Sequence, residues 1–566
     1  MMALILGILA SFGWFYCAGT LLTRRLTKPF HHPAMAFGLS VAGMTVLFSI
    51  VTTWIPIPPP FLLAGGLLFV SMWVMDGRSR FPFPRFKWTP SFIILLTFLV
   101  IFAIALLGYP DFSFDTLSYH GIFIDSFAAD GQIALPIEPT NWVDHVHLIF
   151  PKGVEMVFGL AHALVPYSQG FLQLLIVMGT VGMLGRLSAQ SGIHHPWLAG
   201  LLFLGFSTTL GLTKAFFVEQ TIFFLFLCFL SVLLEQSRPA WLLVLLPLSL
   251  SLTKINAVVV VLAAGMVYAW YSKRWKEMAI IAGSGAVGVG LNFLPAMWRG
   301  FDILSELKIT QAVYYQATPI SMAQRLALMS SGMESVIVSV WGVGLAAALY
   351  LIWRDNGTRM LATILWVALG AFLLALGLTD LYAYTYTHLS IYVFAFIGLT
   401  SLMIARTLEL LAKTTSITRH LGTLFIIGIV IAGFYSGFLT LVFLNSGYHF
   451  GILNYYDTMN KYIPNTGETT LFFMNNINPI RRGFEKITLY DHTSFSSYEQ
   501  PPCDFWRDKG ITHILFWKFQ LNSIQLDHGY PEFFEQSRME FRDPTCLDVL
   551  ILEDTIYGIG IGKMIE

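Results

Sequence analysis

The chain has 566 residues, of which 56% are apolar and 12% charged, and its 33 basic side chains equal its 33 acidic ones. An ordinary soluble domain carries roughly 25% charged residues, so this composition excludes a disordered chain and a soluble globular enzyme. Zero net charge excludes a nucleic-acid binder that works by neutralising phosphates. The remaining class is a polytopic helical membrane protein.

Apolar runs recur from the first residues onward, and we predict about 13 to 14 transmembrane helices from them. The spans lie near 3–22, 34–55, 60–75, 91–108, 171–186, 196–212, 214–234, 240–252, 257–271, 278–295, 333–353, 360–379, 388–408 and 421–443. A spanning helix needs about 20 residues, so the run 240–252 is short. The run 153–166 is shorter than most and ends at Pro166, which favours a juxtamembrane or re-entrant helix.

Charge is distributed unevenly along the chain. Residues 1–444 hold 23 basic and 17 acidic side chains, whereas residues 445–566 hold 10 and 16. Within 1–444, one end of the predicted spans holds 17 basic and five acidic side chains. The other end holds six basic and 12 acidic side chains. Cytoplasmic connectors are rich in Lys and Arg, so loops 109–152 and 296–332 and the tail are predicted to be exoplasmic.

The tail, residues 445–566, has the pattern of a small α/β domain. Strand-like runs occur at 469–474, 487–490, 511–517 and 547–552. The glycine-rich segment 558–563 (GIGIGK) lacks the Ser or Thr and the spacing of a phosphate loop. Cys503 and Cys546 lie on the predicted oxidising side, where a disulfide is permitted and two free thiols are the alternative.

Ionisable groups at membrane depth usually mark function or a compensating pair. In the segment 108–120, Asp111, Asp115 and Tyr119 follow at i, i+4 and i+8, so a helix places them on one face. Two carboxylates there could supply a general base or hold a metal. The alternative is a solvated loop helix with acidic caps.

Further candidates begin or end helices on the same predicted side. Lys214 and Glu219 start an apolar helix, and Lys254 follows the run 240–252. A lysine there suits a lipid phosphate. A Glu219–Lys254 ion pair is the other reading, and the two do not exclude each other. His388 starts another helix among tyrosines, which fits either an interfacial belt or stacking on a sugar. Arg299 could bind phosphate or anchor the interface.

Several motifs together resemble the bacterial branch of membrane glycosyltransferases with the GT-C fold, relatives of the protein mannosyltransferases and the lipid A aminoarabinose transferase. The motifs are DTLSYH (115–120), FPKGVEM (150–156), KAFFVEQT (214–221) and LTKINA (252–257). The resemblance covers about residues 90–510, so residues 1–90, which are read as extra N-terminal transmembrane helices, and much of the tail lie outside it. His388 departs from the pattern, because relatives often carry an Arg there.

The resemblance implies a transferase in a bacterial inner membrane, with its active site on the periplasmic side. It moves a sugar from a polyprenyl-phosphate-linked donor to a glycan or glycolipid acceptor of the cell envelope, with inversion. Asp115 acts as base, Lys254 binds the carrier phosphate, and Asp111 and Glu219 shape the sugar site. The remaining matched positions expected to bind substrate are Tyr119, His120, Glu155 and Lys214. No organic cofactor is implied, and a divalent cation stays open.

The alternative function is a transporter or a lipid or glycan flippase. Such proteins carry broken helices near the bilayer midplane and usually a repeated half. This sequence has its ionisable candidates at one boundary and no internal repeat. Transferase chemistry at the exoplasmic boundary is therefore the primary hypothesis.

Overall fold

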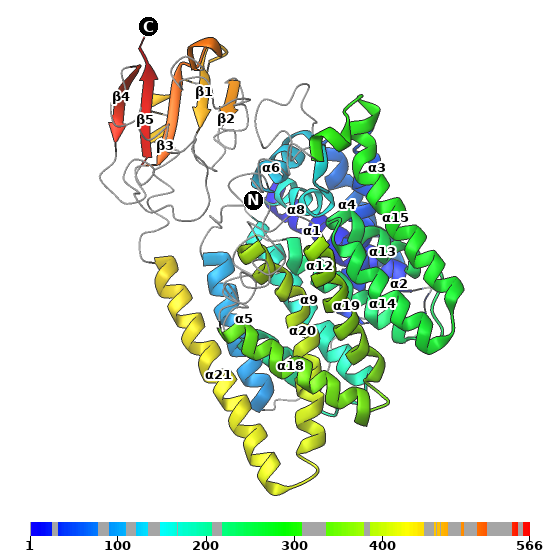
Figure 1. The fold of residues 1–566 in the computed structure, drawn as a ribbon. Helices are drawn as coiled ribbons and strands as arrows, with labels where there is room; N and C mark the ends of the chain where they lie inside the picture. Colours follow the sequence, from blue (N-terminus) through cyan, green and yellow to red (C-terminus); the bar gives the residue numbers. More distant parts are fainter. Residues whose placement is uncertain are drawn as a thin grey trace.

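A computed structural model gives the arrangement of the chain. It describes residues 2–24, 26, 32–76, 90–108, 120–133, 148–166, 168–206, 218–307, 335–378, 385–445, 458–459, 461–464, 466–473, 488–491, 506–517, 546–552 and 559–565. These residues form a large helical body and a small separate sheet (Figure 1).

Every predicted span corresponds to a helix. The N-terminal helices are α1 (Met2–Phe12), η1 (Gly13–Cys17), α2 (Ala18–Thr23), α3 (Pro33–Val51), α4 (Pro59–Met75) and α5 (Pro90–Gly108). The central ones are α6 (Gly121–Asp130), α8 (Gly153–Leu164), α9 (Gln169–Gln190), α10 (Pro196–Gly205), α12 (Val218–Leu234), α13 (Leu242–Thr253), α14 (Ala257–Ser272) and α15 (Trp275–Trp298). The last are α18 (Ser335–Arg354), α19 (Arg359–Leu378), α20 (Thr385–Leu411) and α21 (Ser416–Asn445).

Length separates these helices into two groups. Within the described ranges, six are long and apolar enough to cross a bilayer, namely Met2–Thr23, Pro33–Val51, Pro90–Gly108, Gln169–Gln190, Trp275–Trp298 and Ser416–Val442. Other apolar helices are shorter, including α13, whose predicted span was also short. The chain is thus a mainly helical, multi-pass membrane protein.

Helix α8 begins at Gly153 and ends at Leu164, as expected for a helix too short to cross. Val165 is extended, because a residue before proline is disfavoured in the helical region. A Cβ at Gly153 would lie 2.6 Å from Thr45 Cγ2 and 2.8 Å from the Leu252 carbonyl oxygen. The start of α8 is therefore packed tightly against α3 and the end of α13.

The N-terminal helices are built into the body rather than added to its surface. Helix α3 has twelve buried residues and packs against α8, α9 and α13. Figure 1 shows the blue N-terminal helices beside α8 and α15. At the opposite edge, α21 packs on α5 and α10, with Phe98 stacked on Phe434 at 4.4 Å between ring centroids.

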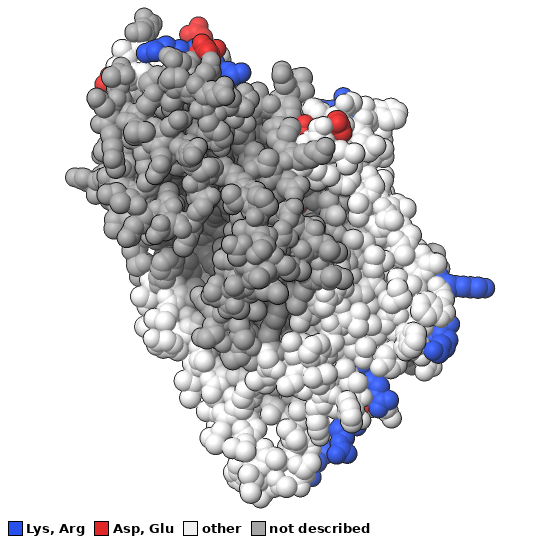
Figure 2. Space-filling model, viewed as in Figure 1, with Lys and Arg blue, Asp and Glu red and all other residues white. Residues whose placement is uncertain are grey.

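The two ends of the helical body differ in charge. On the face shown in Figure 2, most Lys and Arg side chains of the body lie along its lower right edge. We call this end, which carries Lys273, Lys276, Arg354 and Arg419, the basic end. The opposite end, which carries α6, α8 and the end of α13, is called the loop end.

The tail forms a five-stranded sheet. Its strands are β1 (Thr470–Phe473), β2 (Thr488–Asp491), β3 (His513–Trp517), β4 (Leu547–Leu552) and β5 (Ile559–Met564), in the order β2-β1-β3-β5-β4. Strands β2, β1 and β3 are parallel, and β5 runs antiparallel to both β3 and β4. All four predicted strands are confirmed.

Strand β5 was not predicted, because its alternating glycines hide the pattern of a strand. It occupies the segment 558–563 that lacks the features of a phosphate loop, and Ile561 on it is fully buried. Cys546 is disulfide-bonded, whereas its expected partner Cys503 lies outside the described residues. Cys17 and Cys228, both within helices, are buried free thiols.

Candidate active site

His120 and Glu155 form a buried pair at the loop end. His120 immediately precedes α6, Glu155 lies in the first turn of α8, and their side chains are 5% and 1% exposed. His120 Nδ1 lies 2.6 Å from Glu155 Oε1. Glu155 Oε2 is buried without a hydrogen-bond partner in the described part of the chain. Since buried carboxylates need compensation, this second oxygen is a hydrogen-bond acceptor whose burial is not compensated within the described residues.

A second pair joins α12 to the end of α13. Lys254 Nζ forms an ion pair with Glu219 Oε1, and the Glu219 side chain is only 3% exposed. Helix α13 ends at Thr253 because Lys254 is extended, which turns the lysine side chain back toward α12. The contact between Glu219 and Lys254 was the alternative reading of these two residues. Lys254 is thus already paired with a carboxylate and is less suited to bind a phosphate.

A cavity of about 230 Å³ opens at the loop end between α3, α8 and α15. Two cationic side chains line it, Lys152 at the start of α8 and Arg299 directly after α15. The other lining residues are Ser49, Thr52, Thr53, Trp54, Gln132, Ile133, Leu148, Phe150, Met156, Leu291, Asn292, Pro295, Ala296 and Trp298. Two cations among hydroxyl, amide and aromatic groups make this cavity a candidate site for an anion that carries polar groups.

Lys152 is the most perturbed basic group of the cavity. Its burial lowers the pKa to about 8, and the nearby Glu155 carboxylate opposes this shift. Lys152 Nζ donates a hydrogen bond to the Phe150 carbonyl oxygen at 3.0 Å and lies 5.8 Å from the centre of the Phe123 ring. No carboxylate of the described residues forms an ion pair with it. An ammonium held this way gains strongly from an anionic ligand.

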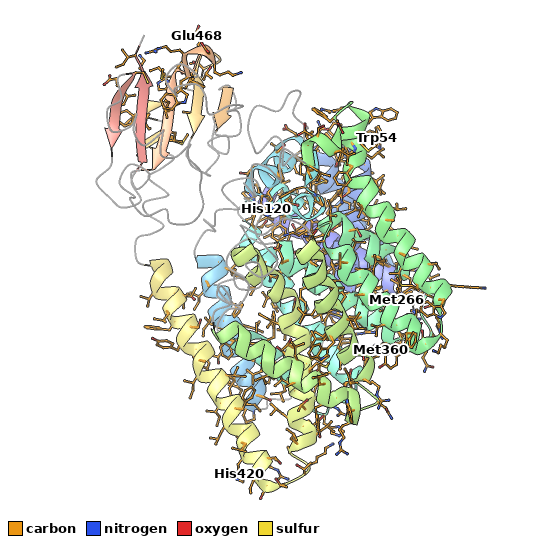
Figure 3. All side chains as sticks on the ribbon, viewed as in Figure 1. Trp54, His120, Met266, Met360, His420 and Glu468 are labelled. Carbon is orange, nitrogen blue, oxygen red and sulfur yellow. The ribbon has the colours of Figure 1, made fainter. Side chains whose placement is uncertain are left out.

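The first turn of α8 connects the cavity with the buried pair. Lys152 and Glu155 are three residues apart, so they lie on the same side of the helix start. Figure 3 places His120 and Trp54 at the same end of the helical body and His420 at the opposite end. Lys152 was not singled out from the sequence, although it stands inside the quoted motif FPKGVEM.

Several predicted site residues cannot be located. Asp111, Asp115, Tyr119 and Lys214 lie outside the described residues. His388 lies in the first turn of α20, as predicted, while its side chain is not among those described. Arg299 lines the loop-end cavity, and its role in binding phosphate stays a prediction.

Within the described ranges, no group of three His, Cys, Asp or Glu side chains could hold a metal ion. The carboxylates for which a metal role was considered, Asp111 and Asp115, are outside those ranges. Metal binding therefore stays a prediction.

The chain is similar to known proteins in structure but not in sequence. No family model matches the chain, and no curated protein matches it in sequence. Among solved structures, the crystal structure of ArnT from Cupriavidus metallidurans bound to undecaprenyl phosphate is similar over 83% of this chain and 97% of that one, with a TM-score of 0.53. The chain has a GT-C fold. At 11% identity, the likeness concerns the GT-C fold alone.

Proposed function

We propose that this chain is a membrane glycosyltransferase that uses a polyprenyl-phosphate-linked sugar as donor. The observation that supports it best is the cavity at the loop end, where Lys152 and Arg299 line one small space. The GT-C fold adds support, because ArnT, which shares it, was crystallised with undecaprenyl phosphate bound. We assign the carrier phosphate to Lys152 and Arg299 rather than to Lys254, because Lys254 pairs with Glu219.

The proposed reaction displaces the carrier phosphate from the sugar. Asp115, assigned by the resemblance of its motif, accepts the proton of an acceptor hydroxyl. The hydroxyl oxygen attacks the anomeric carbon, the bond from that carbon to the phosphate oxygen breaks, and the polyprenyl phosphate leaves with the electron pair. Attack opposite the leaving group inverts the configuration. Lys152 and Arg299 stabilise the charge that develops on the phosphate.

The remaining predicted residues have supporting roles in this proposal. Glu155 Oε2 is suited to accept a hydrogen bond from a sugar hydroxyl, while His120 holds the other carboxylate oxygen. Asp111, Tyr119, Lys214 and His388 stay proposed contacts to substrate. The acceptor is proposed to be a glycan or glycolipid of the envelope, reached from the periplasmic side of a bacterial inner membrane. The excess of basic side chains at the opposite end supports this orientation.

The test is a transfer assay with purified protein in nanodiscs. Donors labelled in the sugar, each a single hexose or pentose on undecaprenyl phosphate, are offered with an envelope lipid extract as acceptor. We expect Asp115→Asn to lower transfer by about a hundredfold or more, because a general base contributes roughly 10²–10⁴ in rate. The matched control is Asp130→Asn, which changes an exposed carboxylate at the end of α6 and is expected to leave transfer unchanged.

Two results would contradict the proposal at different points. Normal transfer by a stable Asp115→Asn protein means that another group is the base. Absence of transfer by the unmodified protein with every donor, together with movement of labelled lipid across the bilayer, would instead establish the flippase alternative.

A further inference from the structure

The mouth of the loop-end cavity is aromatic. Trp54, just beyond α3, and Trp298, the last residue of α15, both line the cavity. Their ring centroids are 5.2 Å apart with an angle of 85° between the planes. The two side chains are nevertheless 49% and 73% exposed. The indoles therefore hold each other in place from two different helices and still present open ring surface.

Polar groups that can still form hydrogen bonds line the same cavity. Ser49 Oγ is buried and has no hydrogen-bond partner in the described part of the chain. Thr53 Oγ1 donates to the Ser49 carbonyl oxygen at 2.7 Å, which leaves its lone pairs as acceptors. Asn292 Nδ2 donates to the Ser251 carbonyl oxygen at 2.9 Å, which orients the amide and leaves Oδ1 to accept. Open aromatic surface with such groups around it suits a ring that has C–H faces and a rim of hydroxyls.

We propose that Trp54 and Trp298, with Ser49, Thr53 and Asn292, form a subsite for the donor sugar. The inference rests on the proposed function, since it takes Lys152 and Arg299 as ligands of the phosphate to which that sugar is attached. Size agrees with this assignment. At about 230 Å³ the cavity is smaller than the roughly 300–1,000 Å³ of pockets that bury drug-sized ligands, so it fits one sugar phosphate headgroup rather than an oligosaccharide.

Most of this subsite comes from the N-terminal helices, which lie outside the motifs shared with other transferases. Ser49 lies on α3, and Thr53 and Trp54 follow it. The loop after them is fixed, because the Ile57 amide donates to the Gly131 carbonyl oxygen at 3.0 Å. Gly131 has φ +70°, and a Cβ there would lie 1.9 Å from the Ile57 carbonyl oxygen, so only glycine fits. In this proposal the end of α3 and the residues just after it supply three of the five subsite residues, and α15 supplies the other two.

The test compares two lipids that differ only in the sugar. Binding of undecaprenyl phosphate, and of undecaprenyl phosphate carrying one hexose or pentose, is measured by native mass spectrometry on the full-length protein in nanodiscs. The unmodified protein is expected to bind at least one glycosylated lipid more tightly than undecaprenyl phosphate. Trp54→Ala and Trp298→Ala should each weaken binding of that lipid by about three- to tenfold, the size of an aromatic contact, and leave undecaprenyl phosphate within twofold.

Two further variants serve as controls. Trp54→Phe keeps a stacking ring and should restore most of the preference for the glycosylated lipid. Trp353→Ala removes a tryptophan that is 84% exposed at the basic end and should change neither affinity. The proposal is overturned if the alanine variants weaken both lipids equally, which indicates a platform for the isoprenoid chain, or weaken neither, which indicates an interfacial anchor.

Failure of the subsite is distinguishable from failure of the proposed function. A protein that binds undecaprenyl phosphate but prefers no glycosylated form lacks the sugar subsite and keeps its phosphate site. A protein that binds none of the lipids contradicts both proposals.

Discussion

Lys152 is the side chain on which the proposed phosphate site depends most. Its ammonium is half-buried, has a carbonyl oxygen as its hydrogen-bond acceptor and is near one carboxylate, Glu155. Because burial lowers the pKa to about 8, the charge that attracts phosphate is present at neutral pH and is lost in mild alkali.

A pH dependence of binding follows. The affinity for undecaprenyl phosphate should be high near pH 7 and fall by about tenfold as the pH rises through 8 to 10, because a hydrogen bond to a charged group is worth roughly 1.5–3 kcal/mol. A bound phosphate raises the pKa of Lys152, so the fall begins somewhat above pH 8 when lipid is saturating. Native mass spectrometry or a fluorescent lipid displaced by undecaprenyl phosphate measures this profile.

The matched variant is Lys152→Arg, which stays charged up to pH 10. It should keep binding at alkaline pH even if its affinity at pH 7 is somewhat lower, since the guanidinium differs in shape. An identical fall in both proteins would mean that another group titrates.

Individual residues also show how far the sequence could lead. Glu219 and Lys254 were recognisable as partners, because each stands at a helix end on the same predicted side. His120 and Glu155 were identified by resemblance, and the structure brings them to 2.6 Å. Lys152 was not chosen, because its importance depends on the cavity that it lines together with α3 and α15. Both helices are far from Lys152 in the sequence. Long-range packing of this kind leaves no local pattern.

At the scale of elements, a network around Arg406 on α20 joins several segments at the basic end. Arg406 Nε donates a hydrogen bond to Asp355 Oδ2 at 2.8 Å. Arg406 Nη1 donates one to Glu409 Oε2 and another to the Gly192 carbonyl oxygen, each also at 2.8 Å. The network ties α20 to the loop after α18 and the turn after α9. Burial raises the pKa of Asp355, but hydrogen bonds from Arg406 and Thr358 outweigh it and hold that pKa below its ordinary value.

Arg406→Ala should destabilise the protein by about 3 kcal/mol, since removing one partner leaves a largely buried carboxylate uncompensated. The readout is the apparent melting temperature in detergent at a fixed heating rate. The control is Arg419→Ala on α21, an exposed position whose loss is expected to have little effect. Equal effects of the two substitutions would show that the network does not hold the basic end together.

Elements differed in how well the sequence predicted them. Long apolar runs predicted helices reliably, because a helix satisfies its own backbone in lipid. Strand β5 was not predicted, because the glycines at its alternate positions have no side chains and so give no alternating pattern. Ile561, between two of these glycines, is nevertheless buried. The central position of α3 in the helical body also could not be predicted. Its residues are apolar on every side, and such a sequence suits a helix that faces lipid as well as one that packs against protein.

At the scale of the whole molecule, the net charge of zero is the sum of two ends of the helical body that differ in charge and a tail that is acidic. The basic end gathers Lys and Arg on short connectors, while the loop end holds the cavity and the two carboxylate pairs. Figure 3 shows this polarity, with His420 at one end of the helical body and Trp54 and His120 at the other.

The most direct test of the account is a cryo-EM map of the full-length protein in nanodiscs with undecaprenyl phosphate. We predict density for the phosphate within hydrogen-bonding distance of both Lys152 Nζ and the Arg299 guanidinium, with the Glu219–Lys254 ion pair intact. Phosphate density at Lys254 with that ion pair broken, or a lipid path that crosses the body to the basic end, would contradict the account.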